Sequence, residues 1–246
     1  MPDRKRRQKR QRRQKHHTSR GPGRTRPDDA ATFRLYSFEV TDEPMPEAPE
    51  RALCPELLNR LDALTEHVHE GSPGEALEEI QSMLKLCPEI PRLHNYLATA
   101  YERLGRWEDA RQVVKETCER FPHYVFGISN YVMFCLEDGD IEEAGRALNK
   151  RYSICEFARG RRKFHHSEVI SYQSAVGLYL CAVGQPEHAV SHAEMLVELA
   201  PDHPLVWRLL VKLYEQGRVL EGPNSLKLAG MFTKAASMAG MAQSSA

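Results

Sequence analysis

Few side chains in this sequence have the spacing that catalysis requires. His188 and His192 are four residues apart, which puts both on one face of a helix in an arrangement that can bind a metal ion. No third ligand accompanies them, and paired histidines are common on helix surfaces, so we expect no metal site. Carboxylate pairs such as Glu142 and Glu143 fall in helical stretches and are expected to face solvent. Phosphate-binding glycine loops, zinc-protease motifs and nucleophile elbows do not occur. The sequence therefore predicts a protein that is not an enzyme and needs no cofactor.

The cysteines give no sign of a metal or disulfide framework. Six are present, none in a CxxC pair or with zinc-type spacing. We expect them to be reduced thiols that pack as small hydrophobic side chains, as in cytoplasmic proteins. They are Cys54, Cys87, Cys118, Cys135, Cys155 and Cys181.

A strong charge asymmetry divides the chain. Residues 1–26 contain twelve Lys and Arg and one acid, whereas the remainder contains 22 Lys and Arg and 33 acids. The neutral total therefore conceals a tail of charge +11 on a body of charge −11. Basic arms of this kind bind nucleic-acid phosphates by counterion release and need no fold. The candidate phosphate-binding residues of the tail are Arg4, Lys5, Arg6, Arg7, Lys9, Arg10, Arg12, Arg13 and Lys15.

Alternative interpretations of the tail remain open. It could instead be a solvated extension, a localisation element or an internal partner for the acidic body. Glutamines rather than aromatic residues alternate with its cations, so base stacking is not expected and any nucleic-acid binding should tolerate any sequence.

A second basic stretch occupies residues 159–166. Its candidate phosphate contacts are Arg161, Arg162 and Lys163. The alternative is a solvated loop or a helix end whose bases complement the helix dipole.

Composition also suggests where folded structure begins. Residues 1–32 are too polar to offset chain entropy and are expected to be disordered. Residues 33–40 are aromatic-rich and strand-like, and either dock on the body or serve as a binding motif. Residues 41–50 form an acidic, proline-rich linker. We therefore expect two regions, a tail with linker over 1–50 and a helical domain over 51–240 that folds without it.

Membrane and secretion signals are not apparent. No apolar region follows the basic amino terminus, so it does not resemble a secretory signal. No stretch approaches 18 consecutive apolar residues, which argues against a transmembrane helix. These features favour a cytoplasmic protein without a membrane partner.

The helical region repeats itself every 34 residues. Glycines and alanines recur with this period, and prolines close the first two units. The units span 57–90, 91–124 and 125–158; a fourth follows an insertion at 170–203, and a partial fifth begins at residue 204. The recurring residues are Gly71, Gly105 and Gly139; Ala76, Ala110 and Ala144; and Pro88 and Pro122.

Each unit has the pattern of two helices joined by a turn. Gly105 allows the left-handed conformation that ends a first helix, and Ala110 is small where two helices cross closely. Pro122 stops the second helix. No strand-like alternation is apparent after Leu53.

These features resemble the tetratricopeptide repeat (TPR) family. The resemblance rests on the 34-residue period, the Gly-x4-Ala spacing, the closing proline and pairs such as Leu97-x3-Tyr101, and covers about residues 57–240. The family implies an all-α, right-handed solenoid of antiparallel helix pairs. It also implies a groove, lined by the first helices, that binds peptides or other proteins.

The register of the repeats nominates groove residues. The candidate groove residues are Asn95, Thr99, Arg103, Phe126, Met133, Leu136, Leu178 and Arg208. The centre of this set is apolar and its flanks are polar, which suits an apolar or amphipathic segment. Some of these side chains could instead belong to the core between repeats. Of the slots that clamp a terminal carboxylate in some TPR proteins, only Asn130 has the right type, so we exclude that clamp.

Two hypotheses follow from the sequence. The first is a non-catalytic scaffold or adaptor that binds another protein or peptide segment in the solenoid groove. The alternative is a nucleic-acid- or ribosome-associated protein that holds phosphates with its tail. The two are compatible, because the tail and the solenoid are separable.

Overall fold

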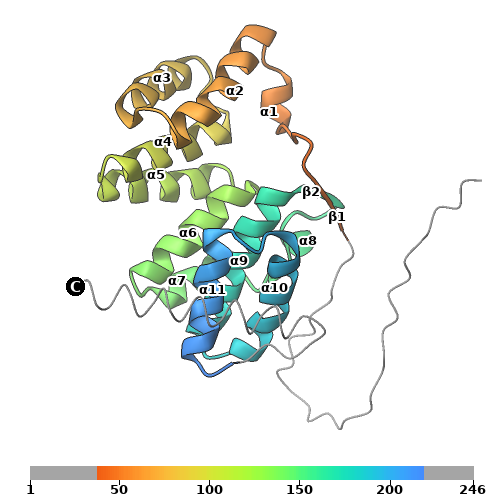
Figure 1. Cartoon of the computed structure of the whole chain (residues 1–246). Coiled ribbons are helices and arrows are strands. Elements are labelled where there is room, and N and C mark those ends of the chain that lie inside the picture. Colours follow the sequence, from red (N-terminus) through yellow and green to blue (C-terminus); the bar gives the residue numbers. More distant parts are fainter. Residues whose placement is uncertain (1–37, 219–246) are drawn as a thin grey trace, which may run out of the picture. The chain divides into compact units, whose positions relative to one another are not determined.

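A computed structural model of the chain describes residues 38–218 (Figure 1). The predicted tail, residues 1–32, and the end of the predicted helical domain, residues 219–240, lie outside the described residues. Eleven helices and two short strands follow one another within this range. They are β1 (Glu39–Thr41), α1 (Ala48–Arg51), α2 (Pro55–His69), α3 (Pro73–Leu86), α4 (Pro91–Arg103), α5 (Trp107–Arg120), α6 (Val125–Glu137), α7 (Ile141–Leu148), α8 (Ile154–Phe157), β2 (Lys163–His165), α9 (His166–Ala182), α10 (Pro186–Leu199) and α11 (Pro204–Glu215).

Local sequence signals explain where the helices begin and end. Helices α2, α3, α4, α10 and α11 each begin at a proline, which suits the first turn because its missing N–H needs no partner there. The turns after α4 and α6 use Gly105 and Gly139 at φ values of 71° and 77°, a conformation that side chains with a Cβ rarely adopt. The predicted helix–turn–helix units are therefore confirmed.

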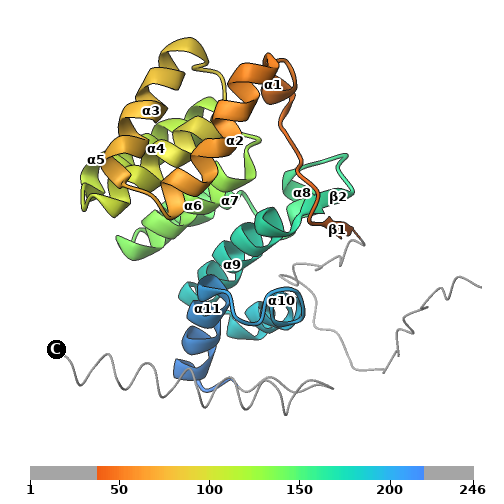
Figure 2. The ribbon, with the colours of Figure 1, turned by 45° about the horizontal axis from the view of Figure 1, so that its top comes forward.

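The helix pairs stack in sequence order. Each first helix packs against the second helix of its own pair, as in α4 with α5 and α9 with α10. Successive first helices also contact each other, from α2 to α4, α6, α9 and α11. Figure 2 shows the resulting array, in which the described residues form an all-α, right-handed solenoid of antiparallel helix pairs.

Small residues set the spacing within each pair. Ala76, Ala110, Ala144 and Ala189 are fully buried at equivalent positions of the four second helices. A longer side chain would have to displace the helix opposite, because protein interiors are close-packed. The alanine row thus marks the crossing points of the helix pairs.

Helix α9 is the centre of the array. It is apolar on every face, and most of its residues from Glu168 to Cys181 are buried against α6, α10 and α11. A helix that is apolar all round is stable only when other elements surround it. The repeats on both sides of the insertion therefore share this helix as common core.

The insertion between the third and fourth pairs departs from the sequence expectation. Helix α7 ends early, because Asn149 and Lys150 both adopt left-handed conformations. Helix α9 begins at residue 166 instead of 170, because His165 and Glu168 form a capping box at its start. The short strand β2 precedes it, so the expectation of no strand after Leu53 is wrong.

Strand β2 pairs in parallel with β1, which lies about 120 residues earlier. Val40 pairs with Phe164, and the Glu39 N–H donates to the Arg162 carbonyl oxygen at 2.7 Å. Phe164 is fully buried and meets the Phe38 ring edge-on at 5.6 Å between ring centroids. The aromatic run thus docks on the solenoid through its last residues, and the folded unit extends further toward the amino terminus than residue 51.

We predict that this docking contributes measurable stability. A chain that starts at residue 52 should unfold with a free energy about 2 kcal/mol lower than one that starts at residue 34, mainly because Phe164 becomes exposed. The exposed ion pairs of the same segment should add little. Urea unfolding followed by circular dichroism measures the difference. Equal stabilities would mean that the solenoid is independent of residues 38–51.

Candidate protein-binding groove

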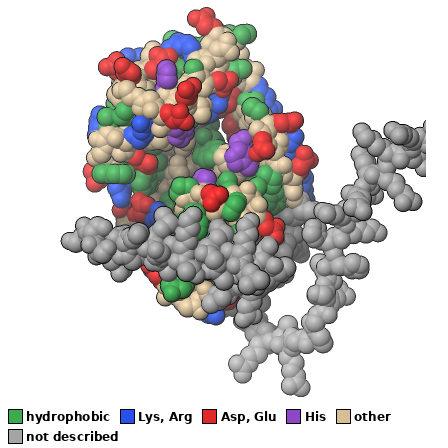
Figure 3. Space-filling view, viewed as in Figure 1, with side chains coloured by type: hydrophobic (Ala, Val, Ile, Leu, Met, Phe, Trp, Pro, Cys, Tyr) green, Lys and Arg blue, Asp and Glu red, His purple; other side chains and the backbone are tan. Residues whose placement is uncertain are grey.

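The first helices of the repeats are tied to one another by polar side chains on one face. The Thr65 and Tyr96 hydroxyls of α2 and α4 are hydrogen-bonded at 2.7 Å. The Asn130 amide of α6 donates to the Asn95 carbonyl oxygen of α4, also at 2.7 Å. Figure 3 shows a hollow near the centre of one side of the molecule, with hydrophobic side chains inside it and charged side chains around it.

The polar candidate groove residues on α4 already form hydrogen bonds within the fold. Asn95 and Thr99 are half-buried, and the Thr99 hydroxyl donates to the Asn95 main-chain carbonyl at 3.1 Å. The contact with Asn130 uses the Asn95 side-chain oxygen and one amide proton of Asn130. A side-chain amide has both donor and acceptor groups, so both asparagines keep capacity for a ligand.

The apolar groove residues separate into two kinds. Phe126, Met133 and Leu136 lie on α6 and are half-buried, so part of each side chain is accessible. Leu178 is only 8% exposed, because α9 is enclosed on all sides. The core interpretation therefore holds for Leu178, whereas the three residues of α6 remain available.

The two arginines of the nominated set hold parts of the solenoid together. Arg103 donates to the carbonyl oxygens of Val68 and Gly71 at 2.6 and 2.8 Å, and so caps the carboxyl end of α2. Arg208 on α11 forms a 2.9 Å ion pair with Glu137 on α6. Because α9 packs against both of these helices, this ion pair links first helices on either side of α9.

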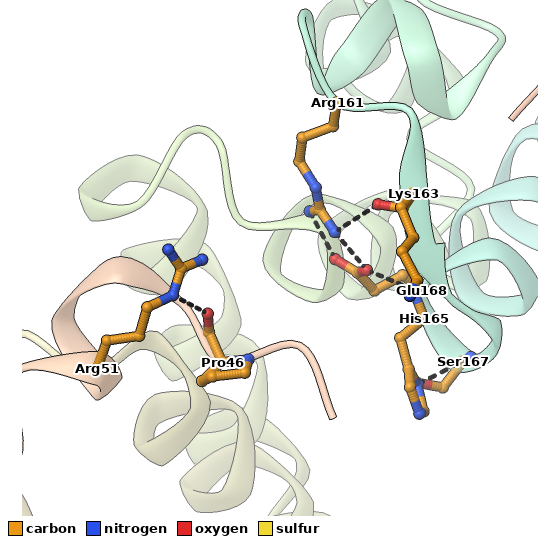
Figure 4. Close-up of polar contacts among 7 residues, drawn as sticks. All are labelled: Pro46, Arg51, Arg161, Lys163, His165, Ser167 and Glu168. Atoms are coloured by element: carbon orange, nitrogen blue, oxygen red, sulfur yellow. Dashed lines mark hydrogen bonds and ion pairs between the residues drawn. The ribbon is translucent and has the colours of Figure 1, made fainter. Parts of the chain in front are cut away.

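The basic insertion is largely neutralised by neighbouring acids (Figure 4). Arg161 binds Glu168 through two nitrogens at 2.9 and 2.7 Å. Lys163 forms ion pairs with Glu43 at 2.8 Å and with Glu39 at 3.7 Å. Arg162 is exposed and contacts the Cys155 thiol. Arg161 and Lys163 thus secure the amino-terminal segment and the start of α9, which weakens the phosphate-binding interpretation of this stretch.

Sequence reasoning missed a buried ionic cluster at the amino-terminal ends of the first helices. Glu50 on α1 is 3% exposed and lies 3.2 Å from Arg92 on α4. Tyr96 and Tyr124 line the same region, and burial raises the pKa of both hydroxyls. The only sequence signal was Pro49, which permits a helix start in the stretch expected to be a linker.

The remaining reactive side chains form no common site in the described residues; Cys135, Cys155 and Cys181 are buried, whereas Cys54 is exposed. All six cysteines are unpaired, and burial raises the pKa of the Cys118, Cys135 and Cys181 thiols to about 11, so these remain protonated. In the described part of the chain, no three His, Cys, Asp or Glu side chains are grouped to hold a metal ion. His192 is buried and hydrogen-bonded to Gln173 at 2.7 Å.

No helix within residues 38–218 is long and apolar enough to cross a membrane.

The helix pairs and their 34-residue spacing define the tetratricopeptide-like α-solenoid class. A solved structure of PilF from Pseudomonas aeruginosa is similar to this chain, with a TM-score of 0.53 and 15% identity over 77% of this chain and 78% of PilF. TPR-like repeats of a kinesin light chain from Podospora anserina score 0.47 at 17% identity, covering 80% of this chain and 98% of theirs. MamA from Desulfovibrio magneticus RS-1 scores 0.45 at 15% identity, covering 77% and 98%.

At these identities the likeness concerns the fold alone, and scores below 0.5 add nothing to it. No protein-family model matches the sequence, and no curated protein matches it significantly. We therefore describe this protein by its fold, which is a TPR-like solenoid with an inserted strand and a docked amino-terminal segment.

We predict that His192 makes the stability of the solenoid depend on pH. Burial lowers its pKa to about 4, so the unfolded chain binds a proton below pH 6.5 that the folded chain does not. The stability advantage over His192→Gln should therefore fall by about 2 kcal/mol between pH 6.5 and pH 5. Urea unfolding at several pH values measures this. His188→Gln, on the half-exposed side of the same helix, is the control and should keep most of the pH dependence of stability. A stability difference between the unchanged protein and His192→Gln that does not change with pH would contradict the role of His192.

Proposed function

We propose that this protein is a non-catalytic scaffold or adaptor that binds a segment of another protein in the groove of α2, α4 and α6. The observation that carries the proposal is the half-buried apolar row of α6, which is Phe126, Met133 and Leu136. The amides of Asn95 and Asn130 lie beside this row. Apolar side chains with amides at their edge suit an apolar or amphipathic segment.

The proposal includes the cellular setting expected from the sequence. Reduced, buried cysteines are typical of cytoplasmic proteins, and such a scaffold needs neither a cofactor nor a membrane. Half-buried apolar side chains are where a partner gains most from burial, since affinity concentrates at a few well-enclosed contacts.

A charge placed in the groove tests this function. A photo-crosslinking residue at position 130 should capture a partner that the same residue at position 86, on the exposed side of α3, does not capture. The identified partner should bind Met133→Asp about tenfold or more weakly than the unchanged protein, because the new carboxylate would be buried without a counter-ion. Leu86→Asp is the matched control and should bind normally. Equal binding by both variants would exclude the α6 row as the binding surface.

A second candidate function is supported by the sequence charge alone. The twelve Lys and Arg of residues 1–26 carry charge +11 net of one acid, which favours a nucleic-acid or ribosome partner held through phosphates. The internal ion pairs of Arg161 and Lys163 leave the tail as the better candidate. The tail and the groove would then bind different partners.

Salt dependence distinguishes this second function. If about eight tail cations reach phosphates, the logarithm of the affinity for single-stranded RNA should fall against the logarithm of salt with a slope of about −6. Deleting residues 1–26 should abolish this binding, whereas Met133→Asp should leave it unchanged. Fluorescence anisotropy at 50 to 200 mM salt provides the measurement. Affinity that survives the deletion would reassign the contact to the solenoid.

A further inference from the structure

The Glu50 carboxylate is a buried charge held by one ion pair and by a hydrogen bond from the Glu47 backbone. It is 3% exposed, yet its ion pair is one 3.2 Å contact with the Arg92 guanidinium. Burial raises the pKa of Glu50 above its ordinary value, although Arg92 opposes the shift. A buried carboxylate with so little compensation costs stability. Its position therefore calls for an explanation beyond the packing of the solenoid.

The surface under Glu50 belongs to the groove-forming helices. Arg92 lies in the first turn of α4, and its outer nitrogen also contacts Asp62 of α2 at 3.1 Å. The buried Nε of Arg92 has no hydrogen-bond partner within residues 38–218. Tyr96 follows one turn later on α4, and Tyr124 stands at the start of α6. These side chains therefore surround Glu50 with one cation that keeps unused donor capacity.

The segment that carries Glu50, residues 42–51, contains little secondary structure. Helix α1 is a single turn without a side-chain cap, and residues 42–47 form no helix or strand. Arg51 closes the turn by donating to the Pro46 carbonyl oxygen at 3.0 Å (Figure 4). At its other end the segment is held by β1 and by the Lys163–Glu43 ion pair. It thus runs between two short anchors (Figure 2).

We propose that residues 46–51 are a built-in ligand, and that Glu50 occupies a carboxylate-binding subsite formed by Arg92, Tyr96 and Tyr124 at the amino-terminal rim of the groove. The partner that fits this subsite is a protein segment with an acidic side chain on a short helical turn. It binds by displacing α1, and its carboxylate takes the place of Glu50. This inference rests on the proposed scaffold function and names the chemistry of the partner. The unpaired Nε of Arg92 favours exchange, because it offers a partner carboxylate a donor that Glu50 does not use.

The chain supplies its own probe for this subsite. A labelled synthetic peptide of residues 43–53 should bind the full-length Glu50→Gln variant about tenfold more tightly than the unchanged protein, whose tethered Glu50 competes at high effective concentration. A matched peptide with Gln in place of Glu50 should bind the same variant about tenfold more weakly than the Glu50 peptide, because it lacks the charge that Arg92 recognises. Fluorescence anisotropy measures both affinities.

Two further variants identify the recognising group. The double variant Glu50→Gln/Arg92→Gln should bind both peptides equally weakly. Glu50→Gln/Asp62→Asn is the matched control: it alters only the exposed contact of Arg92 and should retain the preference for the Glu50 peptide. Circular dichroism of each variant checks that the solenoid is intact.

Hydrogen exchange tests whether Glu50 holds the segment in place. Amides of residues 46–53 should exchange about tenfold faster in Glu50→Gln than in the unchanged protein, while those of α9 should be unaffected. Two results would show that α1 is a fixed part of the fold. One is that the amides of residues 46–53 exchange at the same rate in Glu50→Gln and in the unchanged protein. The other is that the Glu50 and Gln peptides bind the Glu50→Gln variant with equal affinity, or that neither binds. Because these measurements need no natural partner, their failure is distinct from a failure of the crosslinking test at position 130.

Discussion

The structure depends on each helix pair being covered by the next. A single pair exposes an apolar face that it cannot bury alone, so stability comes from stacking along the array. The fully buried alanines at equivalent positions of α3, α5, α7 and α10 allow the close approach that this stacking requires. Helix α9 shows the constraint most clearly, because it is buried on every side by its own partner α10 and by helices of the two neighbouring pairs. The groove exists because the first helices are held side by side by this burial.

The same polar side chains that form the groove also connect the repeats. Thr65 contacts Tyr96, and Asn95 contacts Asn130, in each case between successive first helices. Arg103 reaches back to the carbonyl oxygens at the end of α2. Such contacts hold the groove in one geometry before a partner arrives, which lowers the entropy that binding must overcome. They also use up hydrogen-bonding groups, which is why the proposed binding rests on the apolar row of α6.

Charge organises the amino-terminal edge of the solenoid. The acids of residues 39–50 contact the bases of α4 and of the insertion, in the pairs Glu50–Arg92, Glu43–Lys163 and Asp42–His166. In the sequence the insertion resembled a free basic patch. In the structure it is instead the surface on which an acidic segment of the same chain docks. In residues 1–26, by contrast, the cations greatly outnumber the acids of the same stretch. The two basic regions therefore differ in how many unpaired cations they can present to a partner.

The sequence by itself determined the repeat architecture, because glycine turns, crossing alanines and closing prolines act locally and recur every 34 residues in the first units. It also nominated the accessible α6 row, since helical periodicity shows which residues share a face. Only the tertiary structure decided that Leu178 belongs to the core, that Arg208 reaches Glu137, and that residues 39–41 pair with 163–165. Each of these depends on contacts between residues far apart in the chain, which a periodic pattern cannot specify. The buried Glu50 is the clearest case, because nothing in an acidic, proline-rich stretch distinguishes the one carboxylate that meets Arg92 from its solvated neighbours.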